Sequence, residues 1–426
     1  MQKKYFQILI GLLILSALYT PQGYIIDREA WQWLYLSAIN LGALTYNLYM
    51  TLKGTLKPLK TPISFKIISI LFIWAIASIL YSLSFQVAVI DLSRFFIYLV
   101  SFYNLLIVFN ETEISFKQLS YLFTVLFIIE IFFSYKPLFE IISQGSFQNY
   151  DPNILEGIAS NVNVTSFSIA LKVPFLIYLF YNEKRNFLKA IFISLLILGY
   201  VLLNFLDTRA ITLSNYFILF IILGFSLVNF NKRVFLKSII LISTIFFSFN
   251  IPSFLDSKRS EKNQELIEIT SNSDESTNQR LRYYKAGIKQ IISNPFLGVG
   301  FGNWKLESIK YDKNASIQYI VPYHMHNDFL QFGAELGLIG LILYLTFFVS
   351  IFFKYLIDLK NFKIRWDSKA LVTLLFFTYI FFDSSLNFPF ARPMVFLQLL
   401  IFIAFLEKQL NKHPSWNIFY HFLFYW

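Results

Sequence analysis

The 426-residue chain contains no cysteine. Disulfides, thiolate nucleophiles and cysteine-ligated metals are therefore excluded. Charge is also scarce, because Asp, Glu, Lys and Arg make up 14% of the residues while 56% are hydrophobic. Roughly a quarter of the residues would be charged in a soluble protein. Long apolar runs recur along the whole chain, so the composition indicates a membrane protein with many spans and not one with a single anchor.

Hydropathy predicts about twelve spans of helical length, and the fold class is therefore an all-α polytopic membrane protein. The spans are expected near residues 5–20, 30–50, 63–83, 86–109, 117–134, 163–181, 187–206, 210–230, 234–250, 328–355, 368–386 and 392–408. The basic start of the chain resembles a signal peptide but has no convincing small-x-small cleavage site, so we expect a retained first helix.

The spans divide the chain into four parts. Residues 1–249 carry spans one to nine, and residues 328–408 carry spans ten to twelve. Between them lies a long polar loop, residues 250–327, whose acidic first half is followed by a basic amphipathic segment. The aromatic tail, residues 409–426, is too short to span and is expected at the membrane interface.

The net charge of +11 would suggest nucleic acid as a partner in a soluble protein. Here most lysines and arginines lie in short alternate loops, where they set topology and meet anionic lipid headgroups. We therefore expect membrane lipids and no nucleic acid as partners. The positive-inside rule places both termini in the cytoplasm and the long loop outside it.

Three polar residues are predicted to lie at helix N-termini on that outer side. Arg209 begins a membrane helix, Arg280 lies in the first turn of a loop helix opened by a capping box at Ser276, and His326 precedes the cap of span ten. Free N–H groups and the helix dipole favour anions there. Two arginines at such ends predict a phosphate or pyrophosphate site, and the dipole would keep the His326 imidazole neutral as a general base requires.

Simpler interpretations stand beside this one. A single arginine at a membrane boundary often only anchors its helix, and basic residues on a loop helix often form a solvated face. His324-x-His326 could bind a metal, but no further histidine lies in the loop and no carboxylates cluster nearby, so no metal is assigned. The sequence GVGFG (298–302) has no strand–turn–helix unit around it and predicts a turn. The loop helix is expected to bury Leu281, Tyr284, Ile288 and Ile291 on one face.

Charged residues inside predicted spans indicate function by default. Asp91 and Arg94 lie one helical turn apart and could satisfy each other. Lys172, near the middle of span six, has no obvious local partner in the sequence.

Several motifs occur in a specific order and spacing: Arg280 and its helix, NPFLGVGFGN (294–303), HMHN (324–327) and ELGLIG (335–340). This order resembles the O-antigen ligase and polymerase family of membrane glycosyltransferases, whose fold is of the C superfamily type. The twelve spans and the long loop after span nine resemble the ligases in particular. Met325 departs from the family pattern, in which a small residue is commoner at this position.

The resemblance implies a glycan donor linked to undecaprenyl pyrophosphate, on the outer face of the bacterial inner membrane. It implies a sugar hydroxyl acceptor, either the lipid A core in a ligase or another carrier-bound glycan in a polymerase. Arg209 and Arg280 resemble the family's pyrophosphate-binding arginines, and His326 resembles its catalytic histidine. The resemblance also implies a reaction that needs no metal or other cofactor and that inverts the anomeric centre. The additional candidates for substrate binding are Arg282, Lys285, Lys172, Asn327, His324 and Arg392.

Two alternatives stay open. Ligase and polymerase cannot be separated, since the sequence contains no acceptor-specific motif. A twelve-span transporter or flippase is the alternative from another class, although its long connection would ordinarily follow span six and not span nine.

Overall fold

The computed structural model contains helices as the only regular elements in the part of the chain that it describes. That part comprises residues 2–18, 28–143, 152–159, 161–229, 231–255, 275–312, 322–360 and 367–411. The predicted all-α polytopic fold is confirmed. Two predictions lie outside these ranges, namely the acidic segment over residues 256–274 and the interfacial tail over residues 412–426.

Most helices are long and apolar, because a backbone in lipid must satisfy its own hydrogen bonds. They are α1 (Gln2–Leu18), α2 (Arg28–Leu52), α3 (Ile63–Ala77), α4 (Phe85–Glu111), α5 (Phe116–Ser143), α6 (Val162–Ala170), α7 (Val173–Asn182), α8 (Asn186–Phe205), α9 (Arg209–Asn229), α10 (Lys232–Leu255), α15 (Asp328–Lys360), α16 (Ser368–Leu386) and α17 (Pro393–Asn411). Two further α-helices and five short 3₁₀ turns lie between them: α12 (Glu275–Ser293), α13 (Trp304–Glu307), η1 (Ser78–Tyr81), η3 (Pro152–Leu155), η4 (Gly157–Ala159), η5 (Ser308–Lys310) and η6 (Pro389–Ala391).

Within the described residues, 9 helical segments are long and apolar enough to cross a membrane, judged by length and composition. They include the continuous stretch from α6 to α7 and the first 29 residues of α15. The predicted first, second and ninth spans coincide with α1, α2 and α10, which are not among the nine. A membrane protein with many spans is therefore shown, while the number twelve stays a prediction.

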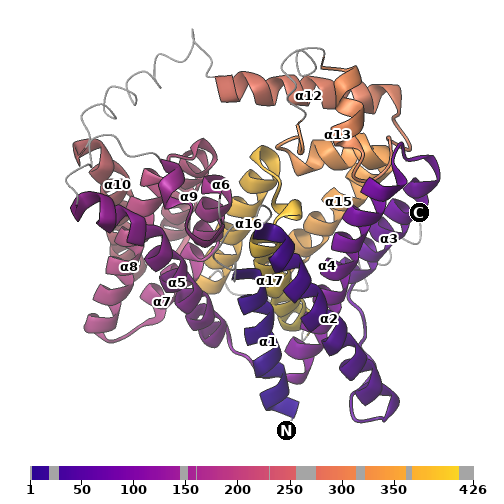
Figure 1. Ribbon diagram of the computed structural model, residues 1–426. Helices are drawn as coiled ribbons and strands as arrows, with labels where there is room; N and C mark the ends of the chain where they lie inside the picture. Colours follow the sequence, from indigo (N-terminus) through magenta and orange to yellow (C-terminus); the bar gives the residue numbers. More distant parts are fainter. Residues whose placement is uncertain are drawn as a thin grey trace.

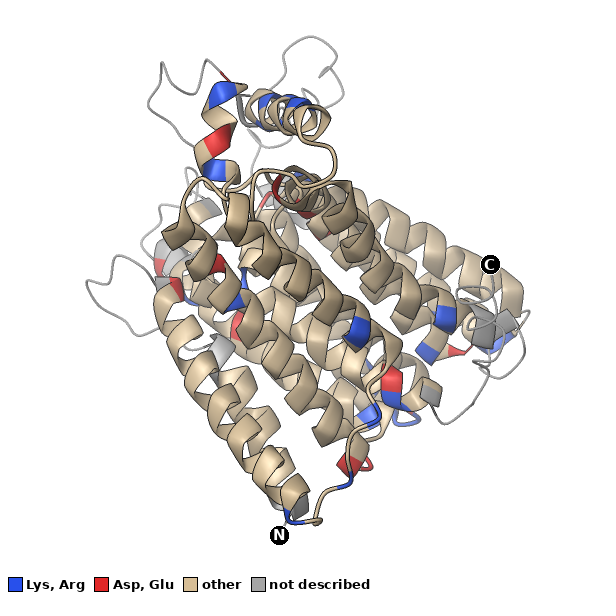
Figure 2. Cartoon of the chain, turned by 90° about the vertical axis from the view of Figure 1, so that its right-hand side faces the viewer, with Lys and Arg blue, Asp and Glu red and all other residues tan. Residues whose placement is uncertain are grey.

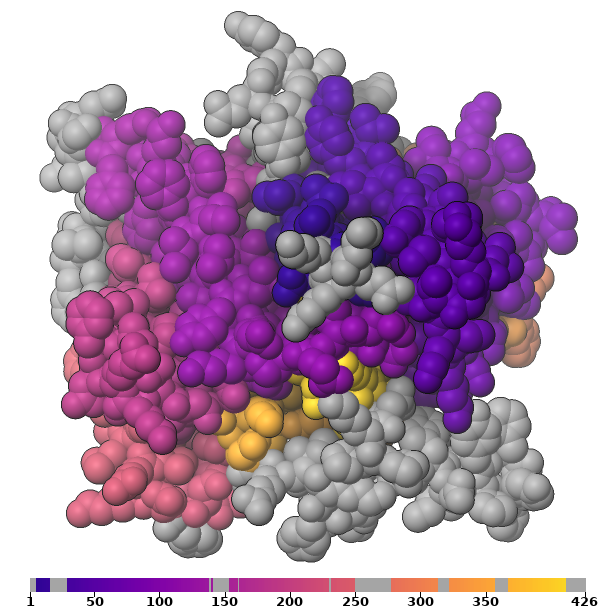
Figure 3. Space-filling model, turned by 90° about the horizontal axis from the view of Figure 1, so that it is seen from below, coloured from indigo at the N-terminus to yellow at the C-terminus, as the bar shows by residue number. Residues whose placement is uncertain are grey.

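The last two helices lie between two groups of earlier ones. In Figure 1, α16 and α17 occupy the middle, with α5 to α10 on one side and α2 to α4 on the other. The view from below in Figure 3 places the yellow and orange segments between the same two groups. The packing agrees, because α17 contacts α4 and α6 while α16 contacts α7 and α9.

Loop helix α12 lies across one end of the bundle, opposite the start of α1 (Figure 1). Figure 2 shows charged residues at this upper end and near the start of the chain, with mostly uncharged helix between them. The distribution is the one that a lipid-embedded middle and two polar ends require.

The sixth predicted span is broken in the middle. Helix α6 ends at Ala170 and α7 begins at Val173, with Pro174 at its second position. Proline cannot donate a helical hydrogen bond, and it disfavours the helical region for the residue before it. The break leaves backbone carbonyls unpaired, and Lys172 donates its ammonium to one of them, the Ser168 carbonyl, at 2.7 Å.

The tenth predicted span is broken as well, at Gly337, which has φ 68° and ψ −173°. The backbone groups released by this break pair with the glycine-rich loop: Gly300 N–H donates to the Glu335 carbonyl at 2.9 Å, and Leu338 N–H donates to the Pro295 carbonyl at 2.7 Å. Two motifs that are separate in the sequence therefore form one structural unit.

The unit depends on glycine at both sides of the contact. A Cβ at Gly298 would lie 2.4 Å from the Glu335 carbonyl oxygen, and a Cβ at Gly337 would lie 2.2 Å from that of Phe296. Both residues also have positive φ, which a side chain would strain. GVGFG is thus a turn, as predicted, and it fixes the long loop onto the upper end of α15.

Candidate active site at the end of the bundle

Arg209 is the first residue of α9, as the sequence predicted. It follows Asp207, whose φ of 51° lies in the left-handed region. The exposed Arg209 guanidinium donates a hydrogen bond to the Thr277 hydroxyl in α12. The start of a bundle helix is thereby joined to the start of the loop helix.

Arg280 lies on α12 in the neighbourhood of Arg209. Burial lowers the pKa of Arg280, as does the like charge of Arg209, whereas Tyr284 opposes the shift. Among the described residues no carboxylate forms an ion pair with Arg280. One prediction was wrong in detail: α12 already includes Glu275, so Ser276 is not its cap and Arg280 lies in the second turn. The capping-box pattern at Ser276 therefore did not locate the first residue of α12.

The face that α12 buries agrees with the prediction only in part, since Tyr284 and Ile291 are partly buried against the bundle end. Tyr283, Ala286 and Gln290 are buried, whereas Leu281 is 47% exposed and Ile288 46% exposed. The prediction followed the apolar residues of the helix alone. The observed face is set by the surface that receives it, which includes the buried side chains of Trp304, Met325 and Ala334.

His326 is held in a strained backbone conformation. It is one of two non-glycine residues in the described chain with positive φ, at 57°. Asn327 caps α15 as predicted, since its side-chain oxygen accepts from Leu330 N–H at 2.9 Å, and its amide donates to the Ser385 carbonyl at 2.8 Å. The Tyr284 hydroxyl donates to the His326 carbonyl at 2.8 Å. Left-handed strain of this kind, held by neighbours on both sides, is characteristic of functional sites.

The His326 ring meets the edge of the Phe388 ring, with centroids 4.8 Å apart and planes at 80°. Its Nδ1 is buried and forms no hydrogen bond. Burial lowers the pKa of His326 to about 4, with the charge of Arg280 as the second cause. The predicted lowering is confirmed, although burial and not the helix end is its main source. The imidazole is therefore neutral at pH 7.

His324 stacks on the face of the same Phe388 ring, with centroids 4.5 Å apart and planes at 17°. Burial lowers the pKa of His324 to about 3, followed by the charges of Lys305, His326 and Arg94. Phe388 therefore holds two neutral histidines side by side. Sequence reasoning missed Phe388; the one available signal was an aromatic- and proline-rich turn between two spans.

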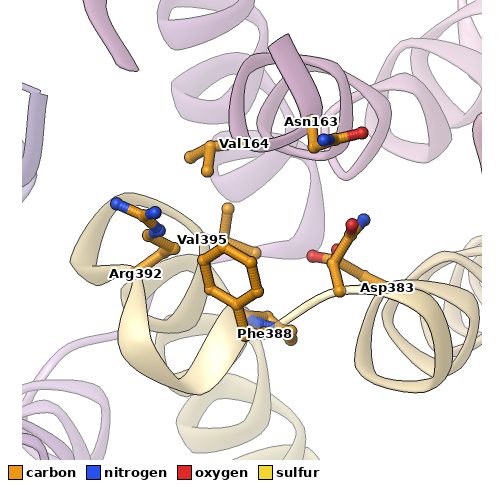
Figure 4. Close-up of a pocket in the computed structure, with 8 residues that line it drawn as sticks. Asn163, Val164, Asp383, Phe388, Arg392 and Val395 are labelled. Atoms are coloured by element: carbon orange, nitrogen blue, oxygen red, sulfur yellow. The ribbon is translucent and has the colours of Figure 1, made fainter. Parts of the chain in front are cut away.

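Arg392 lies over the Phe388 ring, with its guanidinium carbon 4.7 Å from the centroid, and forms an ion pair with Glu29 of α2. Phe388 therefore contacts His324, His326 and Arg392. Figure 4 shows the adjoining pocket, where Phe388, Arg392 and Asp383 surround a space that α6 closes from the opposite side. The pocket is lined by Asn163, Val164, Asp383, Asn387, Phe388, Pro389, Arg392 and Val395.

Lys172 is placed elsewhere. Its side chain is 0% exposed, and its ammonium lies 2.7 Å from a Glu130 carboxylate oxygen of α5. The sequence showed no partner for Lys172, and the structure supplies one 42 positions away. Lys172 follows Asn163 of the pocket by nine residues, about 13 Å along a helix axis. It contacts none of the histidines or arginines described above.

Two further candidates on α12 have other surroundings. Arg282 pairs with Asp312 of the same loop, at 3.3 Å between Nε and the carboxylate. Lys285 is exposed. The structure therefore brings together Arg209, Arg280, His324, His326, Asn327 and Arg392, and leaves Arg282, Lys285 and Lys172 outside this group.

The predicted Asp91–Arg94 pair exists, with 3.3 Å between the charged groups. It has a third member, since Lys305 of α13 lies 3.4 Å from the other Asp91 oxygen. This contact ties the long loop to α4.

Met325, the departure from the family pattern, is completely buried. It packs against Gly287 of α12, where an added Cβ would lie 2.5 Å from the Met325 terminal methyl. The larger side chain is accommodated because the facing helix has none at that position.

No group of three or more His, Asp or Glu side chains in the described ranges is placed to hold a metal ion. His324 and His326 thus lack a third ligand within that part of the chain. The metal-free site stays a prediction.

A model of the O-antigen ligase family matches residues 192–345. This range, which we call the O-antigen ligase segment, is similar to that family. It is also similar to candidate polysaccharide ligases of three Rickettsia species. The relative from R. conorii is 35% identical over 143 residues, 32% of this chain and 33% of the relative. The relative from R. typhi is 37% identical over 91 residues, which are 20% of this chain and 21% of the relative. The relative from R. prowazekii is 35% identical over 107 residues, which are 24% of this chain and 25% of the relative.

The predicted resemblance to the O-antigen ligases is confirmed over residues 192–345, and the chain covers up to about a third of the relatives' length. The matched segment contains Arg209, Arg280, His324 and His326. Phe388 and Arg392 lie beyond its end, and Lys172 lies before its start. The residues that the fold brings together at the bundle end thus come largely from the O-antigen ligase segment.

Proposed function

We propose that this protein transfers a glycan from an undecaprenyl-pyrophosphate carrier to a sugar hydroxyl, without a metal or other cofactor and with inversion at the anomeric carbon. The observation that carries the proposal is the pair of neighbouring arginines, Arg209 and Arg280, placed beside a partly buried, neutral histidine, His326. Two guanidinium groups suit a pyrophosphate leaving group, and a neutral imidazole suits the activation of a hydroxyl. The O-antigen ligase segment supports the same chemistry.

The transfer needs one bond to form and one to break. The acceptor oxygen attacks the anomeric carbon, and the bond from that carbon to the pyrophosphate oxygen breaks. Both electrons of this bond leave with the carrier pyrophosphate, whose growing negative charge is stabilised by Arg280 and Arg209. An imidazole nitrogen of His326 accepts the hydroxyl proton. Attack from the side opposite the leaving group inverts the anomeric centre.

Binding of the donor pyrophosphate is expected to raise the pKa of His326. In the free protein the pKa of His326 is about 4, which makes the imidazole a weak base. A bound pyrophosphate brings negative charge beside the ring and partly neutralises Arg280, and both effects raise the pKa of a nearby histidine. His326 therefore becomes a stronger base when the leaving group is in place.

The experiment uses purified protein in liposomes with an undecaprenyl-pyrophosphate-linked glycan. Two acceptors are offered separately: lipid A core, and a second carrier-linked glycan unit. We expect transfer to lipid A core, as in a ligase, and no change on adding a chelator. Transfer only to the carrier-linked unit would identify a polymerase. His326→Ala should lower the rate roughly 10²- to 10⁴-fold while donor binding persists. Full turnover in this variant, or no transfer to either acceptor, contradicts the proposal.

A transporter would be favoured over an enzyme if Lys172 lined a central cavity. Lys172 is instead fully buried and paired with Glu130. Its charge is neutralised by Glu130, and its buried side chain is not accessible to a transported substrate.

For the orientation, the proposal follows the positive-inside rule: both termini cytoplasmic in the inner membrane and α12 on the periplasmic side. Because the chain has no cysteine, single cysteines report without background. In intact cells, Lys285→Cys should react with an impermeant maleimide and Lys184→Cys should not. Both positions are exposed in the structure. The reverse pattern would place the candidate site in the cytoplasm.

A further inference from the structure

A second group of cations lies next to His324. Arg94 of α4 and Lys305 of α13 approach the same carboxylate, Asp91, at 3.3 Å and 3.4 Å. The Lys305 ammonium also lies 4.0 Å from the centre of the Tyr323 ring. The Arg94 side chain is 28% exposed and that of Lys305 12% exposed, so both retain access from outside. We call Arg94 and Lys305 the second cationic group.

This group has more positive than negative charge in direct contact. Two cations share one carboxylate, and within the described residues no second carboxylate forms an ion pair with either of them. Glu335 interacts with Lys305 electrostatically without forming an ion pair, and its oxygens accept from Gly302 N–H at 2.8 Å and from the Gln331 amide at 3.1 Å. Placing two like charges together in a partly buried site is unfavourable unless an anion joins them.

The second cationic group is continuous with the histidine pair. The Tyr323 ring, which carries Lys305 on its face, packs on His324 at 5.1 Å and 74°. His324 in turn stacks on Phe388, whose edge meets His326. Each histidine therefore has its own cations: His326 is influenced by Arg280, and His324 by Lys305 and Arg94.

We propose that Arg94 and Lys305 bind an anionic group, a phosphate or a carboxylate, carried by the acceptor glycan. The inference rests on the proposed function, in which Arg209 and Arg280 hold the donor, and it defines the acceptor as an anionic sugar. His324 and His326 are two positions apart, at most about 7 Å of chain. One sugar residue that bears both the reacting hydroxyl and the anionic group can therefore extend from one histidine to the other.

The alternative is that Asp91 merely ties the loop to α4, with both cations serving the tie. The two interpretations differ in what happens when Asp91 is changed. If the three side chains are a structural tie, Asp91→Asn and Lys305→Gln damage the site alike. If the cations bind the acceptor, Lys305→Gln weakens acceptor binding whereas Asp91→Asn removes a competitor and leaves it equal or tighter.

The test measures KM for donor and acceptor separately in liposomes of neutral phosphatidylcholine. Lys305→Gln should raise the acceptor KM roughly 10- to 100-fold, the range of one charged hydrogen bond, with the donor KM unchanged. Lys305→Arg should retain most of the affinity. Lys310→Gln is the matched control, because Lys310 also pairs with a carboxylate of this loop, Glu307 at 2.6 Å, but is largely exposed. Its acceptor KM should not change.

A second arm removes the anionic group from the acceptor, by phosphatase treatment or by reduction of its carboxylate. The wild-type acceptor KM should rise by the same factor, and Lys305→Gln should then have no further effect. Equal rises in both KM values for Asp91→Asn and Lys305→Gln overturn the proposal in favour of the structural tie. So does an effect of Lys305→Gln that persists with the neutral acceptor. If Lys305→Gln matters only in liposomes containing anionic lipid, the anion belongs to a lipid headgroup and the acceptor assignment fails.

Failure of the proposed function is recognised separately. If the wild-type protein transfers nothing, acceptor binding is measured without donor on the reconstituted protein. Weaker binding of the anionic acceptor to Lys305→Gln than to Lys310→Gln then supports the site, and equal binding overturns it.

Discussion

Lys172 and Arg280 are two cations that folding withdraws from water, and the fold treats them in opposite ways. Lys172 receives a carboxylate at 2.7 Å, a backbone carbonyl at 2.7 Å and a hydroxyl at 3.0 Å. Arg280 is paired with no carboxylate in the described chain and has another arginine near it. A related difference separates Lys354, which lies 3.0 Å from Glu407, from Arg94 and Lys305, which share the single carboxylate of Asp91.

The difference separates charged residues that stabilise the fold from charged residues that are available to bind a ligand. A buried ion whose partners are all protein groups stabilises one arrangement of helices. A partly buried ion without an opposite charge destabilises the empty site, and binding of an anion relieves this. Charged residues in membrane proteins are often taken as functional without distinction. The contacts of Lys172 and Arg280 separate the two classes.

The largest expected effect is on stability, at Lys172. Lys172→Met leaves the Glu130 carboxylate buried and unpaired, which destabilises by about 3–5 kcal/mol. The melting temperature of the purified protein in detergent should fall strongly. Combining Lys172→Met with Glu130→Leu removes both charges and should restore much of it. A stable single variant would place Lys172 in the same class as Arg280.

The next effect is on activity, at Arg280. Arg280→Ala should lower the transfer rate about 10²- to 10³-fold, the loss typical for removing one donor to a developing anion. Its melting temperature should not fall, because the removed charge has no ion-pair partner. Arg280→Lys should rescue only partly, since an ammonium lacks the guanidinium fork. Lys285→Ala, on the exposed face of α12, is the control and should retain near wild-type transfer.

A smaller effect is expected in the dependence of kcat/KM and kcat on pH. Because the free-protein pKa of His326 is about 4, kcat/KM should be nearly constant between pH 8 and pH 6 and fall below about pH 5. The acid limb of kcat should lie at higher pH, since the bound pyrophosphate raises the histidine pKa. Ionisation of the donor phosphate is measured separately by phosphorus NMR. An acid limb of kcat/KM at or above pH 6.5 would show that His326 is not buried among cations in the free enzyme.

The same shift links folding to pH. The pKa of His326 is lower in the folded state than its ordinary 6.5, so the unfolded state binds the proton first as pH falls. The stability contributed by the neutral imidazole is present above about pH 6.5 and is lost between 6.5 and 4. His324, with its pKa near 3, acts in the same direction.

Sequence predicted the features that are set locally. Arg209 begins α9 and Asn327 caps α15 because each lies at a change from polar to apolar residues, which hydropathy and capping chemistry locate. The helical fold follows from the long apolar runs. The resemblance to O-antigen ligases was predicted from the order and spacing of motifs, which can be read directly from one sequence.

The features that were missed depend on distant neighbours. Glu130 is the partner of Lys172 through the packing of α5 on α6, and no periodicity connects them. Phe388 unites two histidines that lie more than sixty residues before it. The buried face of α12 is set by Met325 and Trp304, so that only half of its predicted apolar stripe is covered. In each case the contact is decided by tertiary packing, which overrides local propensity.

The contact between the two glycine motifs bears on how such proteins diverge. Residues 295–302 fill the break that Gly337 opens in α15, backbone against backbone, with no side chain to absorb a misfit. Either segment taken alone from a relative would meet a partner shaped for another loop. The two are therefore expected to be exchanged and inherited as a pair. A chimera joined before residue 294 or after residue 340 should fold, whereas a junction between residues 303 and 333 should fail.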